Sequence, residues 1–205
     1  MGLGSVGSFT ALTIGKMGVG RIVGYDDDGV APHNLPNQFY PKESIGQFKA
    51  DALKVMLKQF TDVHFTVKKK RYNQSLLEEV AIVVTDSMAS RRLVWDQFKH
   101  QADEIGTKRL YIEGRMGAET GQVFTVRRDN RGLIRPKDIR LYEAMLYDDS
   151  TVPPLPCTAR TIIYNVLMMA SWISGSLKAY VMNEKFPSEI TFNLTQIDER
   201  SLMVN

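Results

Sequence analysis

The chain has 205 residues, of which 43% are hydrophobic and 24% charged, proportions that are typical of a globular protein and argue against a disordered or fibrous one. This length favours a single domain over residues 1–205. The net charge of +3 is too small to indicate a nucleic-acid or membrane partner, and the single cysteine excludes an internal disulfide bond and a paired-cysteine zinc site. One cysteine fits a reducing compartment, so we expect a cytoplasmic protein.

Strands and helices are predicted to alternate, because short apolar runs and amphipathic stretches follow one another with glycine or proline between them. The expected elements of the first half are a helix over residues 5–14, a strand over 21–25, an irregular loop over 30–45, a helix over 46–60, a strand over 64–68 and a helical turn over 74–79. Those that follow are a strand over 81–84, a helix to about residue 102, a strand over 109–113, an antiparallel strand over 122–127, one long helix within 161–182 and a strand over 189–196.

This alternation predicts an α/β fold, Rossmann-like and doubly wound, with a mostly parallel sheet and helices on both of its faces. The C-terminal portion is expected to be antiparallel. In such folds a strand precedes the first helix. Here that strand would lie before Met1, so we expect the first strand to be missing or truncated.

The most apolar stretch, residues 161–182, contains asparagine, serine and lysine, which are too polar for a lipid-facing span. We therefore expect a core helix there, with Met168, Met169 and Trp172 in the core, and no membrane partner. The basic run over residues 68–71 has no interleaved aromatic residues, so it predicts a solvated strand end rather than a nucleic-acid interface.

Three glycines open the first predicted helix with the Gly-x-Gly-x-x-Gly spacing of dinucleotide-binding folds. They are Gly2, Gly4 and Gly7, and Asp26 ends a strand about twenty residues later. Glycines let the backbone approach a phosphate, the helix N-terminus offers unpaired N–H groups, and the carboxylate accepts from ribose hydroxyls. The pattern predicts a nucleotide-binding site, with a purely structural glycine turn as the alternative.

Further motifs occur in the order that they have in one family of enzymes. They are Asp26-x-Asp28-x-Val30-x-x-x-Asn34-Leu35-x-x-Gln38-Phe39, Ile45-Gly46-x-x-Lys49-Ala50, Val84-Thr85-Asp86-Ser87-x-x-x-Arg91, Ile112-Glu113-Gly114, Gly121-Gln122-Val123 and residues 173–179. On these motifs, from Gly2 to about Ala179, the chain resembles the ThiF/HesA/MoeB superfamily, adenylating enzymes related to the ubiquitin-activating enzymes.

The resemblance implies ATP-dependent adenylation of the C-terminal carboxylate of a ubiquitin-like or sulfur-carrier protein, with ATP and Mg²⁺ as cofactors and a homodimer as the assembly. This chemistry requires charge neutralisation more than acid–base catalysis. Lys49, at a helix start, could place its charge on the phosphates, or it could be a solvated lysine. Asp86, at the end of a buried strand, could hold Mg²⁺ or cap the next helix.

Asn34, Gln38 and Asp28 could bind ribose or phosphate, or they could only brace the loop in which they lie. Asp27 is expected to face away from the site. Cys157 follows a proline-rich stretch at a helix start, where the dipole stabilises a thiolate. It could accept the activated carboxyl group as a thioester, or it could pack as a small residue.

Three departures from the family pattern keep other functions open. Asn37 stands where the family has an arginine, a second family arginine has no counterpart, and a tetrathiolate zinc site cannot form. A catalytically impaired nucleotide-binding scaffold is therefore one alternative. An NAD-dependent oxidoreductase that uses the same glycine fingerprint is another, although no paired proton-relay residues are evident.

Overall fold

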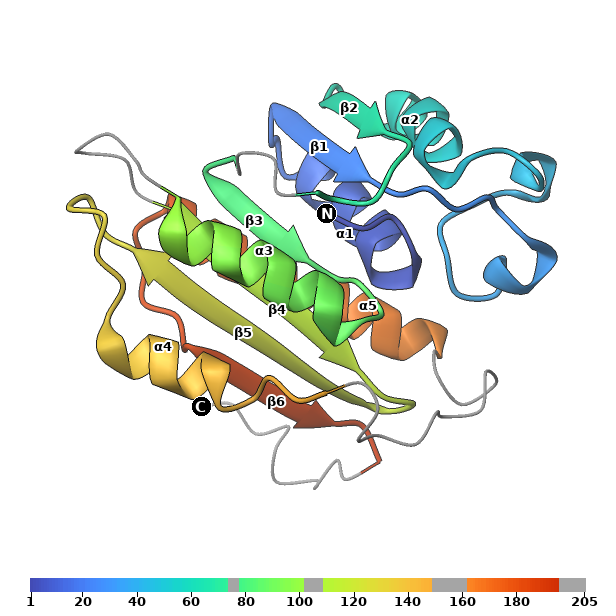
Figure 1. Ribbon diagram of the computed structural model, residues 1–205. Coiled ribbons are helices and arrows are strands. Elements are labelled where there is room, and N and C mark those ends of the chain that lie inside the picture. The colour runs from blue at the N-terminus through green and yellow to red at the C-terminus, as the bar shows by residue number, and fades with distance from the viewer. Residues whose placement is uncertain (74–77, 102–108, 149–161, 196–205) are drawn as a thin grey trace, which may run out of the picture.

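A computed structural model describes residues 1–73, 78–101, 109–148 and 162–195. Their helices and strands alternate from the N-terminus and end in an antiparallel group (Figure 1). In chain order they are α1 (Ser5–Lys16), β1 (Arg21–Tyr25), α2 (Lys49–Phe60), β2 (His64–Lys68), β3 (Val80–Val83), α3 (Met88–His100), β4 (Arg109–Met116), β5 (Thr120–Arg128), α4 (Pro136–Glu143), α5 (Ile163–Val181) and β6 (Glu189–Asn193).

The strands form two sheets. β1 and β2 pair in parallel, with Arg21 level with His64. The second sheet has the order β3-β4-β5-β6, in which β3 and β4 are parallel and the two later pairings are antiparallel. The predicted α/β, Rossmann-like class and its antiparallel C-terminal portion are confirmed, with two parallel and two antiparallel pairings among the described strands.

Helices cover both faces of the second sheet, as predicted. α5 packs against β4, β5 and α1 on one face, while α3 and α4 lie on the other (Figure 1). Packing between α5 and the sheet is tight, because a Cβ on Gly114 would lie 2.8 Å from Met169 Cε. On the α3 side, Trp95, Tyr111 and Tyr142 are buried together, with ring centroids 4.5–5.3 Å apart.

β1 and β3 are not hydrogen-bonded to each other, and the N-terminus lies between them (Figure 1). The Met1 amine donates to the carbonyl of Val23 (3.2 Å), and the Met1 carbonyl accepts from the Tyr25 N–H (2.9 Å). This is the bonding pattern of parallel strands, centred on Gly24. Met1 thus occupies the position where the expected first strand would end.

Several element bounds differ from the predicted ones. α2 begins at Lys49 rather than 46, because Gly46 has a positive φ of 86° and its N–H donates to the Val30 carbonyl instead (2.9 Å). β4 and β5 are longer than predicted, since they continue as a hairpin. α4 was not predicted, because two turns are too short for a helical period to be identified. Residues 74–77 of the expected helical turn lie outside the described residues.

Not every expected core residue of α5 is buried. Met169 is fully buried, whereas Met168 and Trp172 are 37% and 42% exposed. The expectation for these two residues was wrong, because successive helical positions cannot all face the sheet. Within the described part of the chain, the helices are too short or too polar to cross a bilayer.

Candidate functional site

The glycine turn leads directly into α1. A Cβ on Gly7 would lie 1.8 Å from the Gly2 carbonyl oxygen, so only glycine lets the first turn of α1 pack on the preceding backbone. At Gly4, by contrast, nothing lies within 4 Å of a Cβ. Gly4 caps α1 without a side-chain hydrogen bond, and the first turn holds no acidic residue. The N–H groups of this helix start are therefore suited to an anionic ligand.

Asp26 fixes the end of β1 to this turn. Its Oδ2 accepts from the Leu3 N–H and its Oδ1 accepts from the Asp28 N–H, both at 3.0 Å. Burial raises the pKa of Asp26 above that of an ordinary aspartate, although the two backbone donors and Lys49 oppose this shift. The structure thus places the predicted acidic group beside the predicted glycines, with further lone pairs left to accept from a ligand.

Lys49 is a buried cation at the first position of α2. Its side chain is only 8% exposed, and Nζ donates to Asp28 Oδ2 at 2.8 Å. The Lys49 N–H also donates to the Asp28 carbonyl (3.0 Å), which brings the helix start to the acidic loop. Lys49 is therefore not a solvated helix lysine, while Asp28 is 60% exposed and can exchange its partner for a ligand.

Asp86 follows β3 and lines the same cavity as Lys49. The adjacent α3 is capped by Ser87, whose Oγ accepts from the Ser90 N–H (3.2 Å), so the capping role considered for Asp86 belongs to its neighbour. Within the described residues the Asp86 carboxylate is exposed and makes no hydrogen bond or ion pair. A carboxylate of this kind is a ligand type that Mg²⁺ prefers in proteins, so Asp86 could hold a metal ion.

The two amide residues of the loop have different surroundings. Asn34 is buried, and its Oδ1 accepts from the Ala31 N–H (2.9 Å), so it braces the loop and is not among the residues that line the cavity. Gln38 does line the cavity, and its buried Oε1 has no hydrogen-bond partner. A buried acceptor without a partner is costly, which makes Gln38 the better candidate to contact a ligand.

A buried charge network adjoins Asp86. Glu113 is fully buried and accepts from Arg91 Nη1 (2.8 Å) and from Arg115 Nε. Both arginines line the cavity, and Arg91 Nη2 also donates to the Thr85 carbonyl, next to Asp86. Two guanidinium groups against one carboxylate leave a net positive charge at this wall. Sequence reasoning gave these residues no role, although a glutamate inside an apolar strand was a visible signal.

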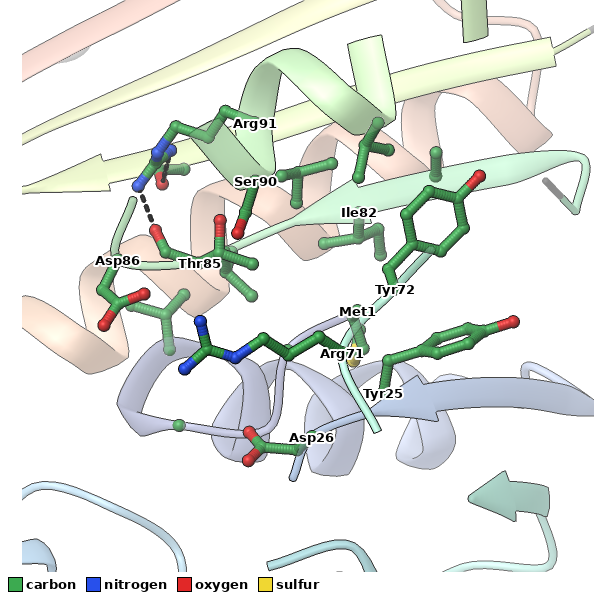
Figure 2. Close-up of a pocket in the computed structure, with 18 of the residues that line it drawn as sticks. Met1, Tyr25, Asp26, Arg71, Tyr72, Ile82, Thr85, Asp86, Ser90 and Arg91 are labelled. Carbon is green, nitrogen blue, oxygen red and sulfur yellow. Dashed lines mark hydrogen bonds between the residues drawn. The ribbon is translucent and has the colours of Figure 1, made fainter. Parts of the chain in front are cut away.

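The cavity has a volume of about 810 Å³ and lies between β1 and β3. Figure 2 shows the Arg71 guanidinium between the carboxylates of Asp26 and Asp86. Arg71 Nε lies 3.3 Å from Asp27 Oδ2, so Asp27 lines the cavity instead of facing away as expected. The side chain of Arg71 is 79% exposed, as predicted for a solvated strand end, but it also lines the cavity, and that role is a further one that sequence reasoning missed.

The predicted residues that the cavity brings together come from five segments: the glycine turn, the acidic end of β1, the loop before α2, the start of α2 and the end of β3. They are Gly2, Gly4, Asp26, Asp28, Gln38, Lys49 and Asp86. Gly7 lies behind the turn, and Cys157 lies outside the described residues.

A glycine turn at a helix start, an acidic strand end and clustered cations at the carboxyl ends of strands define a Rossmann-like α/β protein with a ligand site at these strand ends. The chain belongs to the ThiF family, whose model matches residues 1–203. No curated protein sequence matches it.

Solved structures resemble the chain in fold. They include PaaA (16% identity, TM-score 0.73, 97% of this chain and 60% of that one), E. coli MccB with AMPCPP and MccA (14%, 0.70, 97% and 60%) and E. coli MccB with ATP (14%, 0.65, 97% and 60%). The chain thus spans about 60% of the length of these proteins.

Proposed function

We propose that this protein catalyses ATP-dependent adenylation of the C-terminal carboxylate of a protein or peptide. One observation carries the proposal: Lys49, Asp86 and the glycine turn, which lie far apart in sequence, line one cavity at the carboxyl ends of β1 and β3. Membership of the ThiF family supports it, as do solved structures of MccB with ATP.

In the proposed reaction, a carboxylate oxygen of the substrate attacks the α-phosphorus of ATP. A carbon–oxygen–phosphorus linkage forms, the bond from the α-phosphorus to the bridging oxygen breaks, and pyrophosphate leaves with that electron pair. Negative charge accumulates on the phosphate oxygens, and Lys49, Arg71 and the α1 N–H groups neutralise it.

Asp86 would hold Mg²⁺, which supplies further positive charge to the phosphates when bound. Asp26 would accept from the ribose hydroxyls, as carboxylates do at this position of dinucleotide-binding folds. Gln38 would accept one further hydrogen bond, because its Oε1 has no partner among the described residues.

The substrate we propose is a small ubiquitin-like or sulfur-carrier protein, whose C-terminus would enter the cavity. The solved structures of MccB with MccA support a polypeptide substrate for a related fold. Transfer of the activated carboxyl group to the Cys157 thiol, with loss of AMP and formation of a thioester, is the proposed second step.

Pyrophosphate exchange tests the proposal, since labelled pyrophosphate enters ATP only if the carboxylate displaces it reversibly. With candidate carrier proteins and free-carboxylate peptides, we expect exchange that Lys49→Ala and Asp86→Asn each reduce by about 10²-fold or more. Lys58→Ala and Asp62→Asn, on exposed positions outside the cavity, should leave it unchanged.

Two results would contradict adenylation in different ways. ATP binding without exchange would favour the catalytically impaired nucleotide-binding scaffold. The presence of Asn37 where the family has an arginine supports that alternative. Tight binding of NAD with no binding of ATP would favour the oxidoreductase.

We also propose that the protein forms a homodimer. Exposed apolar side chains gather on one helix and support this assembly: Tyr164, Leu167, Met168 and Trp172 of α5 are each at least 37% exposed. A face of this kind on a soluble domain indicates a contact surface.

A further inference from the structure

A group of exposed cations follows the end of β5, on the turn that leaves this strand and on the outer side of α4. Figure 1 shows this connection between β5 and α4 at one end of the sheet. Residues 129–140, which we call the basic surface, present four cationic side chains to solvent: Arg131, Arg135, Lys137 and Arg140.

The basic surface lies apart from the nucleotide site. None of its residues lines the cavity between β1 and β3. The basic surface begins directly after Arg128, which pairs with Arg109 at the first position of β4, whereas Gly114 and Arg115, which line the cavity, lie toward the last. A ligand on the basic surface would therefore leave the cavity open.

Most of these cations have no counter-ion, because the carboxylate of α4 faces the interior. Asp138 is buried, and it accepts from Arg135 Nε (2.8 Å) and from the Ser188 hydroxyl (3.2 Å). Lys137 and Arg140, three residues apart on α4, lie on the exposed side instead. Three cations make no hydrogen bond or ion pair with any described residue: Arg131, Lys137 and Arg140.

The turn before α4 is held in one conformation by its own hydrogen bonds. Asp129 Oδ1 accepts from the N–H groups of Arg131 (2.9 Å) and Leu133 (3.0 Å), and the Asp129 N–H donates to the Leu133 carbonyl (2.9 Å). Gly132 provides the positive φ of 76° that this turn requires. Because the turn is already ordered, its backbone loses little conformational entropy when a partner binds.

This ordered turn exposes one apolar side chain among the cations. Leu133 is 61% exposed, and in sequence it lies between Arg131 and Arg135. Protein–protein interfaces combine an apolar centre with a polar rim, and arginine is enriched in them whereas lysine is depleted. Three of the four cations here are arginines, whose guanidinium groups bind carboxylates through two parallel hydrogen bonds.

Other anionic partners fit these residues less well. Proteins that bind single-stranded nucleic acids stack the bases on aromatic side chains, and residues 129–140 contain none. A phosphate backbone also offers no pocket to Leu133. Binding at a bilayer surface depends on a large buried apolar face, which one leucine does not provide.

We propose that the basic surface is a docking site for an acidic protein. Carboxylates of the partner pair with Arg131 and Arg140, and an apolar pocket of the partner receives Leu133. The inference goes beyond the proposed function and does not rest on it.

Fluorescence anisotropy tests the contribution of charge. The probe is a fluorescein-labelled peptide in which pairs of glutamates alternate with pairs of leucines, and its control has glutamine in place of glutamate. We expect saturable binding of the acidic peptide only, weakened about tenfold in the Arg131→Gln/Arg140→Gln double variant. The matched Lys54→Gln/Lys58→Gln variant removes the same charge from exposed positions of α2 and should change the affinity less than about twofold.

Leu133→Ser tests the apolar contact, because it changes no charge. We expect it to weaken binding of the acidic peptide by about tenfold. Val55→Ser is the matched control, on a position of α2 that is exposed to nearly the same degree (59% against 61%), and it should leave the affinity unchanged. Thermal unfolding of each variant should match that of the parent, since all of these side chains are exposed.

Several results would overturn the inference. They are no saturable binding of the acidic peptide, equal losses in the two double variants, and an unchanged affinity in Leu133→Ser. Duplex DNA and phosphatidylserine vesicles are the remaining probes. If either binds more tightly than the peptide and loses that binding in the Arg131→Gln/Arg140→Gln variant, the basic surface serves a different class of partner and the inference is wrong.

Discussion

The glycine turn is the residue-scale feature on which the site depends, and two of its glycines should respond differently to the same substitution. Gly7→Ala places a Cβ 1.8 Å from the Gly2 carbonyl, which forces the turn and α1 apart. We expect a loss of roughly 1–3 kcal/mol or more in the free energy of unfolding, measured by urea denaturation.

Gly4→Ala is the matched control, because nothing lies within 4 Å of its Cβ. It should leave stability within about 0.5 kcal/mol of the parent and instead weaken nucleotide binding, since Gly4 lines the cavity. Equal stability of the two variants would contradict the steric account.

Asp26 should make ligand binding sensitive to pH. Its ionised form accepts from ribose hydroxyls, and burial raises its pKa above the ordinary value of 3.8. Affinity is therefore complete above the raised pKa and is lost as the pH falls through it. We expect this loss in calorimetric titrations with adenosine, which carries no titrating phosphate.

Asp26→Asn should bind adenosine weakly at every pH and show no such dependence. Asp27→Asn, one residue away, should keep the pH dependence of the parent. A parent protein whose affinity stays constant while the pH falls through the titration of this carboxylate would show that Asp26 does not contact the ribose.

At the scale of elements, Glu113 holds α3 to β4 from inside the protein. Its carboxylate accepts from Arg91, Arg115, Tyr111 and Tyr142, and burial raises the pKa of Tyr111 well above that of an ordinary tyrosine. Glu113→Ala leaves two buried guanidinium groups without a counter-ion. We expect a loss of about 3–5 kcal/mol in the free energy of unfolding.

Asp51→Asn provides the comparison for Glu113, because Asp51 pairs with Lys69 where both side chains are about half exposed. Asp51→Asn should lower the free energy of unfolding by no more than about 1 kcal/mol. Similar losses for the two variants in chemical denaturation would show that the buried network is not a major source of stability.

The exposed face of α5 gives a prediction at the same scale. Trp172→Glu should shift the protein from dimer to monomer in light scattering, because it places a charge in the proposed interface. Val55→Glu, on an apolar position of α2 that is even more exposed (59% against 42%), should leave the dimer unchanged. A parent protein that is monomeric at all concentrations would contradict the proposed dimer.

For the whole molecule, the sequence predicted most of the elements and much of the site. β1 and β2 have the predicted bounds, and Gly20 and Asp26 mark the ends of β1. The glycine spacing also predicted the neighbourhood of Asp26 correctly. These are local signals, in which the residues that matter lie within one element or at its end.

Contacts between distant segments could not be predicted in this way. Glu113 contacts Arg91 and Tyr142 only because β3 pairs with β4 and α4 packs on the sheet. Neither the strand pairing nor the position of α4 produces a periodic pattern in the sequence. The solvent exposure of Arg71 agrees with the prediction, but its place in the cavity could not be predicted, because in sequence it is indistinguishable from its lysine neighbours. Its role depends on where the end of β2 lies relative to β3.

The contact between Lys49 and Asp28 has a thermodynamic consequence for binding. A lysine side chain loses up to about 2 kcal/mol of rotational entropy when it is held in one conformation. In this protein folding already imposes that loss of entropy, because the Lys49 side chain is only 8% exposed and its Nζ is held 2.8 Å from Asp28 Oδ2. An incoming phosphate therefore meets an ordered cation, and its association is opposed mainly by desolvation of the two charged groups.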